Sequence, residues 1–233
     1  MLMGGTVIST IEYHGNMSLV IFLAKCPLRC PYCHNSQLLE SGTETELRSV
    51  RNTIDDSADF IDAVIVSGGE PLLQVDDACE ILKYAKSINL KTKFDTSGVY
   101  PDRLAKVLDY VDCISLDIKA PFNKYVEVIG ADIGGDVKKS MDLINNHGGI
   151  KLECRTTYVS SLLDDEDIIQ IAKEIKCDEY TIQQFRNRDV LDESLKEVEC
   201  SNPHDLENLA YKVKQYQKVV KTKTAEFGLK TIN

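Results

Sequence analysis

Six short apolar runs recur along this sequence, and they alternate with segments whose apolar residues follow a helical spacing. The runs cover residues 19–24 and then begin at Ala63, Lys91, Cys113, Lys151 and Glu179. Runs of this length that are rich in β-branched residues are typical of strands buried on both faces of a parallel sheet. Their alternation with helices predicts right-handed βαβ crossovers, and therefore an α/β fold whose parallel sheet is either open or curled toward a barrel.

Polar side chains collect where these predicted strands end. The groups are Ser67 to Glu70, Asp95 to Ser97, Asp117 with Lys119, Arg155 to Thr157, and Gln183 with Gln184. Parallel α/β folds build their sites at the carboxyl ends of their strands. We therefore expect these side chains to border one functional site.

The length and the composition predict a single globular domain. A chain of 233 residues can bury a full core, and its 43% hydrophobic and 27% charged residues are ordinary for a globular protein. We expect one domain over 1–233, with a core from about 17 to 185 and a C-terminal helix and tail from about 202 to 233. Asn202 and Pro203 are a favourable cap and first-turn pair for that helix. Its expected apolar stripe consists of Leu206, Leu209, Ala210, Val213 and Val220.

The charge balance limits the kinds of partner. With 37 acidic and 27 basic residues the formal net charge is -10, so the chain has no general attraction for nucleic acid or for an anionic membrane. The N-terminus lacks a secretion signal, and no stretch approaches the roughly 18 apolar residues of a membrane span. We expect a cytoplasmic protein that acts on a protein or a small molecule, with no nucleic acid and no membrane as partner.

Three of the eight cysteines, Cys26, Cys30 and Cys33, lie within eight positions directly after the first apolar run. We expect the other five to be mostly buried, reduced thiols: Cys79, Cys113, Cys154, Cys177 and Cys200. A tetrahedral zinc site would need a fourth ligand, and His34 is poorly placed because adjacent residues rarely direct both side chains onto one ion. Three thiolates suit a four-iron cluster better, and they leave one iron open to another ligand.

The spacing of these cysteines, with Tyr32 before the last one, resembles the signature of radical S-adenosylmethionine (SAM) enzymes. The strings SGGEPLLQ, FDTSG, LDIKAP and RTTYV follow in the order of one subfamily. The chain is most similar to activating enzymes of glycyl-radical enzymes, in particular to the anaerobic ribonucleoside-triphosphate reductase activating proteins. The resemblance runs from Ser9 to the IQQFRNRD segment, and it implies a partial (β/α)6 TIM-type barrel of parallel strands. Relatives usually have Gly before the first cysteine, where this chain has Lys25.

The resemblance implies two cofactors. A [4Fe-4S] cluster would be held by the three cysteines, and SAM would bind the open iron through its amino and carboxylate groups. Gly68, Gly69 and Glu70 match the family motif whose backbone and carboxylate receive the SAM amino group. Asp95 and Thr96 match a pair near the SAM carboxylate, which in some members lies beside a monovalent cation.

The remaining members of the expected cofactor-binding set come from two other strands and the cysteine loop. Asp117 and Lys119 match groups at the SAM ribose and carboxylate, and Arg155 would pair with the carboxylate. The family uses the backbone around Tyr32 to hold adenine, and His34 is included in the same set. Each motif also has a purely structural interpretation: a tight Gly-Gly turn, a helix cap, an ion pair on an edge strand, or packing of the loop.

The family reaction generates a 5′-deoxyadenosyl radical that removes a Cα hydrogen from one glycine of a large partner enzyme. The resemblance thus predicts an anaerobic oxidoreductase whose partner is a ribonucleotide reductase and whose electron donor is a protein such as flavodoxin or ferredoxin. Glu12, Tyr13 and His14 match a loop at the family's substrate entrance. Gln183 and Gln184 stand where pyruvate formate-lyase activases carry a His, which argues against formate-lyase. Two alternatives stay open: a radical SAM enzyme acting on a small molecule, and an electron carrier or structural metal domain.

Overall fold

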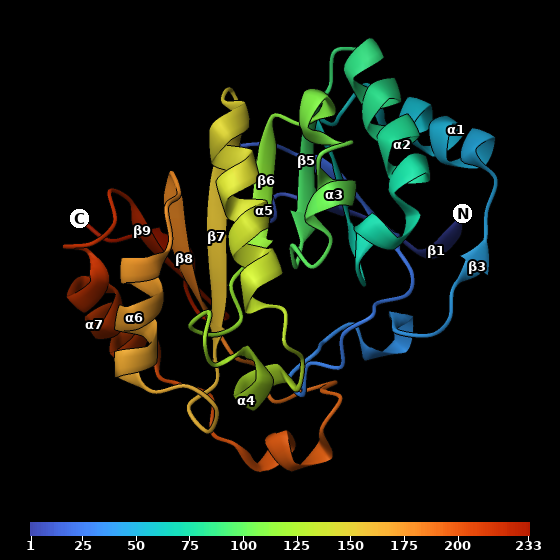
Figure 1. Cartoon of the computed structure of the whole chain (residues 1–233). Coiled ribbons are helices and arrows are strands. Elements are labelled where there is room, and N and C mark those ends of the chain that lie inside the picture. Colours follow the sequence, from blue (N-terminus) through green and yellow to red (C-terminus); the bar gives the residue numbers. More distant parts are fainter.

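One ten-stranded sheet forms the centre of the protein in a computed structural model that describes residues 1–233 (Figure 1). The strand order is β10-β9-β8-β7-β6-β5-β4-β2-β1-β3. The strands are β1 (Leu2–Ser9), β2 (Ser18–Leu23), β3 (Thr43–Glu44), β4 (Ala63–Gly68), β5 (Lys91–Thr96), β6 (Cys113–Asp117), β7 (Lys151–Tyr158), β8 (Glu179–Gln184), β9 (Val220–Thr224) and β10 (Gly228–Thr231).

All six predicted strands are present, as β2, β4, β5, β6, β7 and β8, and neighbours in this series pair in parallel. Strand β9 continues the parallel series beside β8, whereas β1, β3 and β10 are antiparallel to their neighbours. The prediction of an α/β fold with a parallel sheet is confirmed, and the sheet is the partial barrel that the resemblance implied. Because parallel neighbours end at the same edge of a sheet, the polar strand ends meet on one face.

The helices lie on one side of the sheet in Figure 1, where α2, α5, α6 and α7 stand in front of the strands. The helices are α1 (Leu47–Ser57), α2 (Val75–Ser87), α3 (Pro101–Leu104), α4 (Tyr125–Ile129), α5 (Gly134–His147), α6 (Asp165–Glu174) and α7 (Pro203–Val213). Four short 3-10 helices cover Ser36–Leu38, Pro71–Gln74, Leu108–Tyr110 and Glu193–Glu197. The predicted helical stripes of α2, α5 and α6 pack against the strands in one apolar core. None of the helices has the length and apolar character that a membrane span requires.

The C-terminal region differs from the prediction. Helix α7 begins as expected, with Pro203 in its first turn and the Asn202 side chain accepting from the His204 N–H at 2.9 Å. It ends at Val213, so placing Val220 on the helical stripe was wrong. Val220 begins β9 and lies opposite Tyr180 of β8. Its spacing from Val213 fits a helix, but the intervening residues 214–219 turn the chain back onto the sheet.

The eight cysteines are all free thiols. Cys79, Cys113 and Cys154 are buried, as predicted for the cysteines outside the loop. Cys177 and Cys200 are only partly buried. None of these five residues lies in the cavity that holds the other three.

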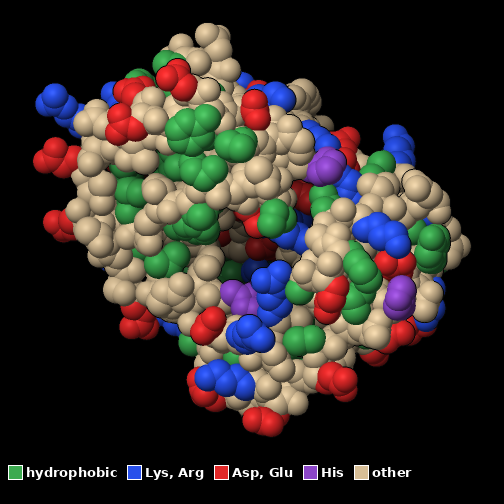
Figure 2. Space-filling view, turned by 180° about the vertical axis from the view of Figure 1, so that it is seen from behind, with side chains coloured by type: hydrophobic (Ala, Val, Ile, Leu, Met, Phe, Trp, Pro, Cys, Tyr) green, Lys and Arg blue, Asp and Glu red, His purple; other side chains and the backbone are tan.

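The sheet does not close on itself, since β10 and β3 are its two edge strands, and an ion pair links the connection between β1 and β2 to β9. The β1–β2 connection carries Glu12, whose carboxylate lies 3.0 Å from the Lys223 ammonium of β9. Seen from the side opposite the helices, the molecule is hollowed at its centre, and acidic and basic side chains are visible inside the hollow (Figure 2).

Candidate active site

A cavity opens over the carboxyl ends of β2, β4, β5, β6 and β7, and it collects nearly all of the predicted site residues. The predicted residues that line it are Cys26, Cys30, Tyr32, Cys33, His34, Gly68, Gly69, Asp95, Thr96, Asp117, Lys119 and Arg155. Glu70 alone among the predicted set does not line it. The structure therefore brings the predicted residues together around one cavity, and their roles there stay predictions.

The cysteine loop leaves β2 through a residue in the left-handed region. Lys25 has a φ of 72°, a conformation that favours glycine, which is the residue that the family resemblance implied before the first cysteine. Its N–H donates to the Leu38 carbonyl at 2.6 Å, and its carbonyl accepts from the Glu70 N–H at 2.8 Å. The Asn35 side chain donates to the Gly68 carbonyl at 3.0 Å. These bonds fix the loop against the end of β4.

The chemistry of the three thiols fits a metal cluster. Burial raises the pKa of the Cys26 thiol to about 11 and also raises that of Cys30, against the opposing effect of nearby Lys119. Buried thiols of this kind become thiolates when a metal replaces the proton. No group of three His, Cys, Asp or Glu side chains, the three thiols included, is arranged around a single metal ion.

Gly68, the last residue of β4, and Gly69 after it allow a close approach of the backbone. A Cβ on Gly68 would lie 2.1 Å from the Leu23 carbonyl oxygen, and one on Gly69 would lie 2.3 Å from that of Lys25. The Gly69 N–H donates to the Leu23 carbonyl at 2.9 Å. The lack of a Cβ at both glycines therefore lets the end of β4 pack directly against the start of the cysteine loop. A tight turn alone would not require this close contact.

Glu70 is fully buried and is already satisfied by the protein. Its carboxylate accepts from the Leu72 N–H at 3.1 Å, from the Thr96 hydroxyl at 2.8 Å, and from both the N–H and the hydroxyl of Ser97. Burial raises the pKa of this carboxyl, and the donors act against that rise. In this arrangement the carboxylate positions the end of β5 and is not directed into the cavity, which differs from the role that the family motif implied.

Arg155 finds its anionic partners within the protein. Its guanidinium lies 2.9 Å from an Asp117 carboxylate oxygen and 3.3 Å from one of Asp95. Asp117 and Arg155 are directly opposite each other on β6 and β7, and the second Asp117 oxygen lies 3.4 Å from the Lys119 ammonium. Because β6 is a central strand, an ion pair on an edge strand is excluded as the reason for Asp117 and Lys119.

Two aromatic rings of the loop border the cavity. The Tyr32 hydroxyl is buried and has no hydrogen-bond partner. Burying it in this way costs free energy unless a bound molecule supplies the missing partner. The His34 ring stacks on Phe185 with centroids 6.3 Å apart, and its Nδ1 lies 3.1 Å from the Arg188 carbonyl oxygen. His34 thus joins the cysteine loop to the segment after β8.

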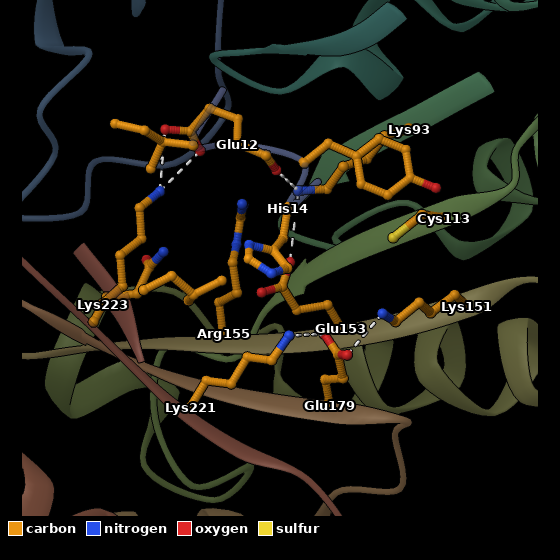
Figure 3. A pocket seen from close by; sticks show the side chains of 14 residues that line it. Glu12, His14, Lys93, Cys113, Lys151, Glu153, Arg155, Glu179, Lys221 and Lys223 are labelled. Atoms are coloured by element: carbon orange, nitrogen blue, oxygen red, sulfur yellow. Dashed lines mark hydrogen bonds and ion pairs between the residues drawn. The ribbon is translucent and has the colours of Figure 1, made fainter. Parts of the chain in front are cut away.

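A second, charged cavity adjoins the first inside the barrel (Figure 3). Lys93 is 2% exposed and lies 3.5 Å from carboxylate oxygens of both Asp95 and Glu153, and it also donates to the Glu12 carbonyl. Sequence analysis did not single out Lys93 and Glu153. Period-two spacing could have found them, because Lys93 and Asp95 share one face of β5, and Glu153 and Arg155 share one face of β7.

Comparison with known proteins identifies the family. The sequence profile of the radical SAM superfamily matches residues 20–176 of this chain. The chain belongs to this superfamily. A protein of Methanocaldococcus jannaschii, MJ1227, is 38% identical over 92% of each chain, and it is named as a candidate glycyl-radical enzyme activating enzyme. The pyruvate formate-lyase-activating enzyme of Clostridium pasteurianum is 28% identical over 88% of this chain and 85% of its own length.

Solved structures support the same fold. TYW1 with a lysine-pyruvate adduct bound superposes with a TM-score of 0.69 over 95% of this chain and 83% of that chain, at 12% identity. Streptococcus suis SuiB bound to its precursor peptide SuiA gives 0.67 over 84% of this chain, at 20% identity, although this chain spans only 45% of SuiB. At these identities the likeness concerns the fold alone. The assignment of this radical SAM enzyme to the glycyl-radical enzyme activating group rests on the MJ1227 match and on the family profile.

Proposed function

We propose that Cys26, Cys30 and Cys33 hold a [4Fe-4S] cluster with which this enzyme installs a glycyl radical on a partner enzyme. The observation that carries the proposal is the cavity itself, which gathers three free thiols and the polar strand ends in a chain 38% identical to MJ1227. When bound, the reduced cluster and SAM supply methionine and a 5′-deoxyadenosyl radical, which takes a hydrogen atom from a glycine Cα of the partner.

The chain's own residues would bind and orient the cosubstrate. Tyr32 offers an unpartnered hydroxyl, and Lys119 and Asp117 offer charges that line the cavity. Arg155 is neutralised by two carboxylates, so its proposed contribution is to hold Asp117 and Asp95 in place as well as to meet the SAM carboxylate. These assignments would give charge-assisted contacts in a cavity that excludes much of the water.

We do not extend the proposal to a monovalent cation. Asp95 is paired with Arg155 and Lys93, and the Thr96 hydroxyl donates to Glu70. These two side chains thus already serve the charge network and the Glu70 site of the protein itself.

The proposed partner is an anaerobic ribonucleoside-triphosphate reductase, and the proposed reductant is a small electron-transfer protein such as flavodoxin or ferredoxin. The sequence match of the IEYHG, LDIKAP and IQQF segments to that activase branch supports this choice. Since the relatives include pyruvate formate-lyase-activating enzymes, formate-lyase is the natural comparison in the test.

Electron paramagnetic resonance tests the proposal. The reduced protein, SAM and each candidate partner are mixed without oxygen, and we expect a protein-based doublet with the reductase. Deuterating the α position of the target glycine should collapse the doublet toward a singlet. Rapid formation of 5′-deoxyadenosine with a metabolite, and no protein radical with any glycyl-radical enzyme of the same cell, would replace this proposal by a small-molecule reaction.

A further inference from the structure

Lys93 is a buried cation whose presence the proposed function does not explain. It belongs to β5, two residues before Asp95 and on the same face of the strand. Its side chain is 2% exposed, and it lines the charged cavity but not the cavity of the three thiols. Asp95 lines the cavity of the thiols, and Arg155 lines both cavities. Lys93 therefore acts on a molecule bound beside the thiols through other side chains and not by contact.

Lys93 and Asp95 both carry their charge. Burial acts to lower the pKa of the Lys93 ammonium, but Asp95 and Glu153 more than offset it, so the pKa lies above its ordinary value. Burial acts to raise the pKa of the Asp95 carboxyl, and Arg155 and Lys93 together bring it below its ordinary value. Each of the two groups thus keeps the other ionised in the interior.

Glu153, the other carboxylate beside Lys93, is well satisfied without it. The Lys93 ammonium lies 3.5 Å from a Glu153 oxygen, and Figure 3 shows it joined to Glu153 and to the Glu12 carbonyl oxygen. Both Glu153 oxygens also accept from hydroxyls, one from Ser115 at 2.6 Å and the other from Thr181 at 2.8 Å. Loss of Lys93 would therefore leave Glu153 with a hydrogen bond to each oxygen.

Asp95 depends on Lys93 more strongly. Its Oδ2 accepts from the Ser67 hydroxyl at 3.2 Å and lies 3.3 Å from the Arg155 guanidinium. Its Oδ1 is buried and accepts no hydrogen bond, and the charged group that it faces is the Lys93 ammonium at 3.5 Å. A buried carboxylate oxygen without a hydrogen bond is tolerated only when a cation balances its charge.

The loss of Lys93 would be felt at Arg155. The guanidinium also lies 2.9 Å from an Asp117 oxygen, so it already serves two carboxylates. Without Lys93, Arg155 would be the one cation in an ion pair with Asp95, and Asp95 would compete with Asp117 for it. A guanidinium drawn toward Asp95 and neutralised by it has less charge to offer to a further carboxylate.

We propose that Lys93 is a positioning residue for the cosubstrate: it balances the charge of Asp95 and so leaves the Arg155 guanidinium in place to receive the carboxylate of SAM. This inference rests on the proposed function, which gives Arg155 that contact. The competing explanation is that Lys93 only stabilises the barrel interior. Lys221 allows the two to be separated, because it is 8% exposed and pairs with Glu179, and neither of these residues lines the cavity of the thiols.

The test compares Lys93→Met with the matched control Lys221→Met. Each variant replaces one buried lysine of the charged cavity by an unbranched apolar side chain. Equilibrium binding of SAM and iron content are measured on the reconstituted proteins, and urea unfolding on the cluster-free proteins. We expect the dissociation constant for SAM to rise about tenfold in Lys93→Met, with iron content retained. It should be unchanged in Lys221→Met, although both variants lose stability.

A second background shows whether Lys93 acts through Asp95. In Asp95→Asn, adding Lys93→Met should not weaken SAM binding further, because no charge is left at Asp95 for Lys93 to balance. Should Lys93→Met alone be too unstable to purify, Lys93→Met/Glu153→Gln replaces it. This pair removes the carboxylate charge that Lys93 would leave at Glu153, and it should show the same weakened SAM binding.

Three results would overturn the inference: unchanged SAM affinity in Lys93→Met, an equal loss in Lys221→Met, or a further loss when Lys93→Met is added to Asp95→Asn. A wild type that forms no cluster or binds no SAM would overturn the proposed function and this inference together. A wild type that binds SAM and forms a glycyl radical, but shows none of the expected Lys93 effects, would overturn the inference alone.

Discussion

The three thiols of the loop after β2 share one cavity, whereas the other five cysteines lie apart from it. Changing Cys26, Cys30 or Cys33 to Ala should each abolish SAM cleavage and reduce bound iron, because a cluster held by three thiolates has no substitute ligand. Iron content after anaerobic reconstitution and 5′-deoxyadenosine formation measure the effect. Cys200→Ser is the control and should retain both; loss of iron in Cys200→Ser would contradict the three-thiolate assignment.

Asp117 is the residue through which the proposed SAM contacts can be tested with the least disturbance. It is a third exposed, lines the cavity and lies between Arg155 and Lys119. Asp117→Asn keeps the shape but removes the charge, so SAM affinity should fall roughly ten- to hundredfold, equivalent to about 1.5–3 kcal/mol. Equilibrium binding to the reconstituted protein measures this, with unchanged iron content. An Asp136→Asn control, in the first turn of α5 and outside the cavity, should bind normally, and equal affinities in both variants would leave Asp117 with a structural role only.

The positions of the site residues could be predicted from the sequence, but their partners could not. Strand ends are visible in local patterns, and this placed Asp95, Asp117 and Arg155 around one site. Which carboxylate faces Arg155 depends on the register between β6 and β7, which no local pattern encodes. The partners of Glu70 could not be predicted either, because the four hydrogen-bond donors around its carboxylate come from two separate segments.

At the scale of elements, the contact between β4 and the cysteine loop is the one that a small change would break. Gly69→Ala would place a Cβ against the Lys25 carbonyl, so the loop and the strand must separate. We expect a loss of about 1–3 kcal/mol in unfolding free energy together with weaker cluster binding. Urea unfolding and iron titration measure the two effects. Gly135→Ala, where nothing lies within 4 Å, should be neutral or slightly stabilising; similar losses in both variants would refute this account.

The six parallel strands were predictable because each is a buried apolar run, whereas the strands that complete the sheet were not. Strand β1 is largely exposed and contains two glycines, so its pattern is weak. Strand β9 alternates Val220, Thr222 and Thr224 with lysines, and Lys221 and Lys223 project into the barrel. A strand whose inward-facing side chains are polar has no continuous apolar run, so a prediction based on apolar runs misses it.

At the scale of the whole molecule, the barrel interior is held by charges instead of by an apolar core alone. Lys93 and Asp95 of β5 and Arg155 of β7 are buried, Glu153 of β7 is mostly buried, and the four side chains interact between these two strands. Charges buried in this way are tolerated only when they are paired and hydrogen-bonded. The polar interior therefore links the Glu12 loop, through Lys93, to Asp95 in the cavity that holds the three thiols.

Lowering the pH should reduce the contribution of these buried ion pairs to the stability of the fold. Burial favours the neutral form of Glu153, but Lys93 and Arg155 more than offset it and lower the pKa of that carboxyl below its ordinary value. A carboxyl whose pKa is lower in the folded state contributes stability above its unfolded pKa of about 4.3, and this contribution is lost as the pH falls through the folded value.

Glu153→Gln should therefore cost roughly 1–3 kcal/mol of unfolding free energy at pH 7, because Lys93 loses one of its two carboxylate partners. The difference between variant and wild type should shrink below about pH 4, where the wild-type carboxyl is itself becoming protonated. Urea unfolding of the cluster-free proteins at pH 7 and at low pH, followed by circular dichroism, measures both values. Glu193→Gln on the exposed 3-10 helix serves as the control and should show no pH-dependent difference. A Glu153→Gln penalty that stayed constant with pH would mean that shape and hydrogen bonding, and not charge, are what Glu153 contributes to the barrel.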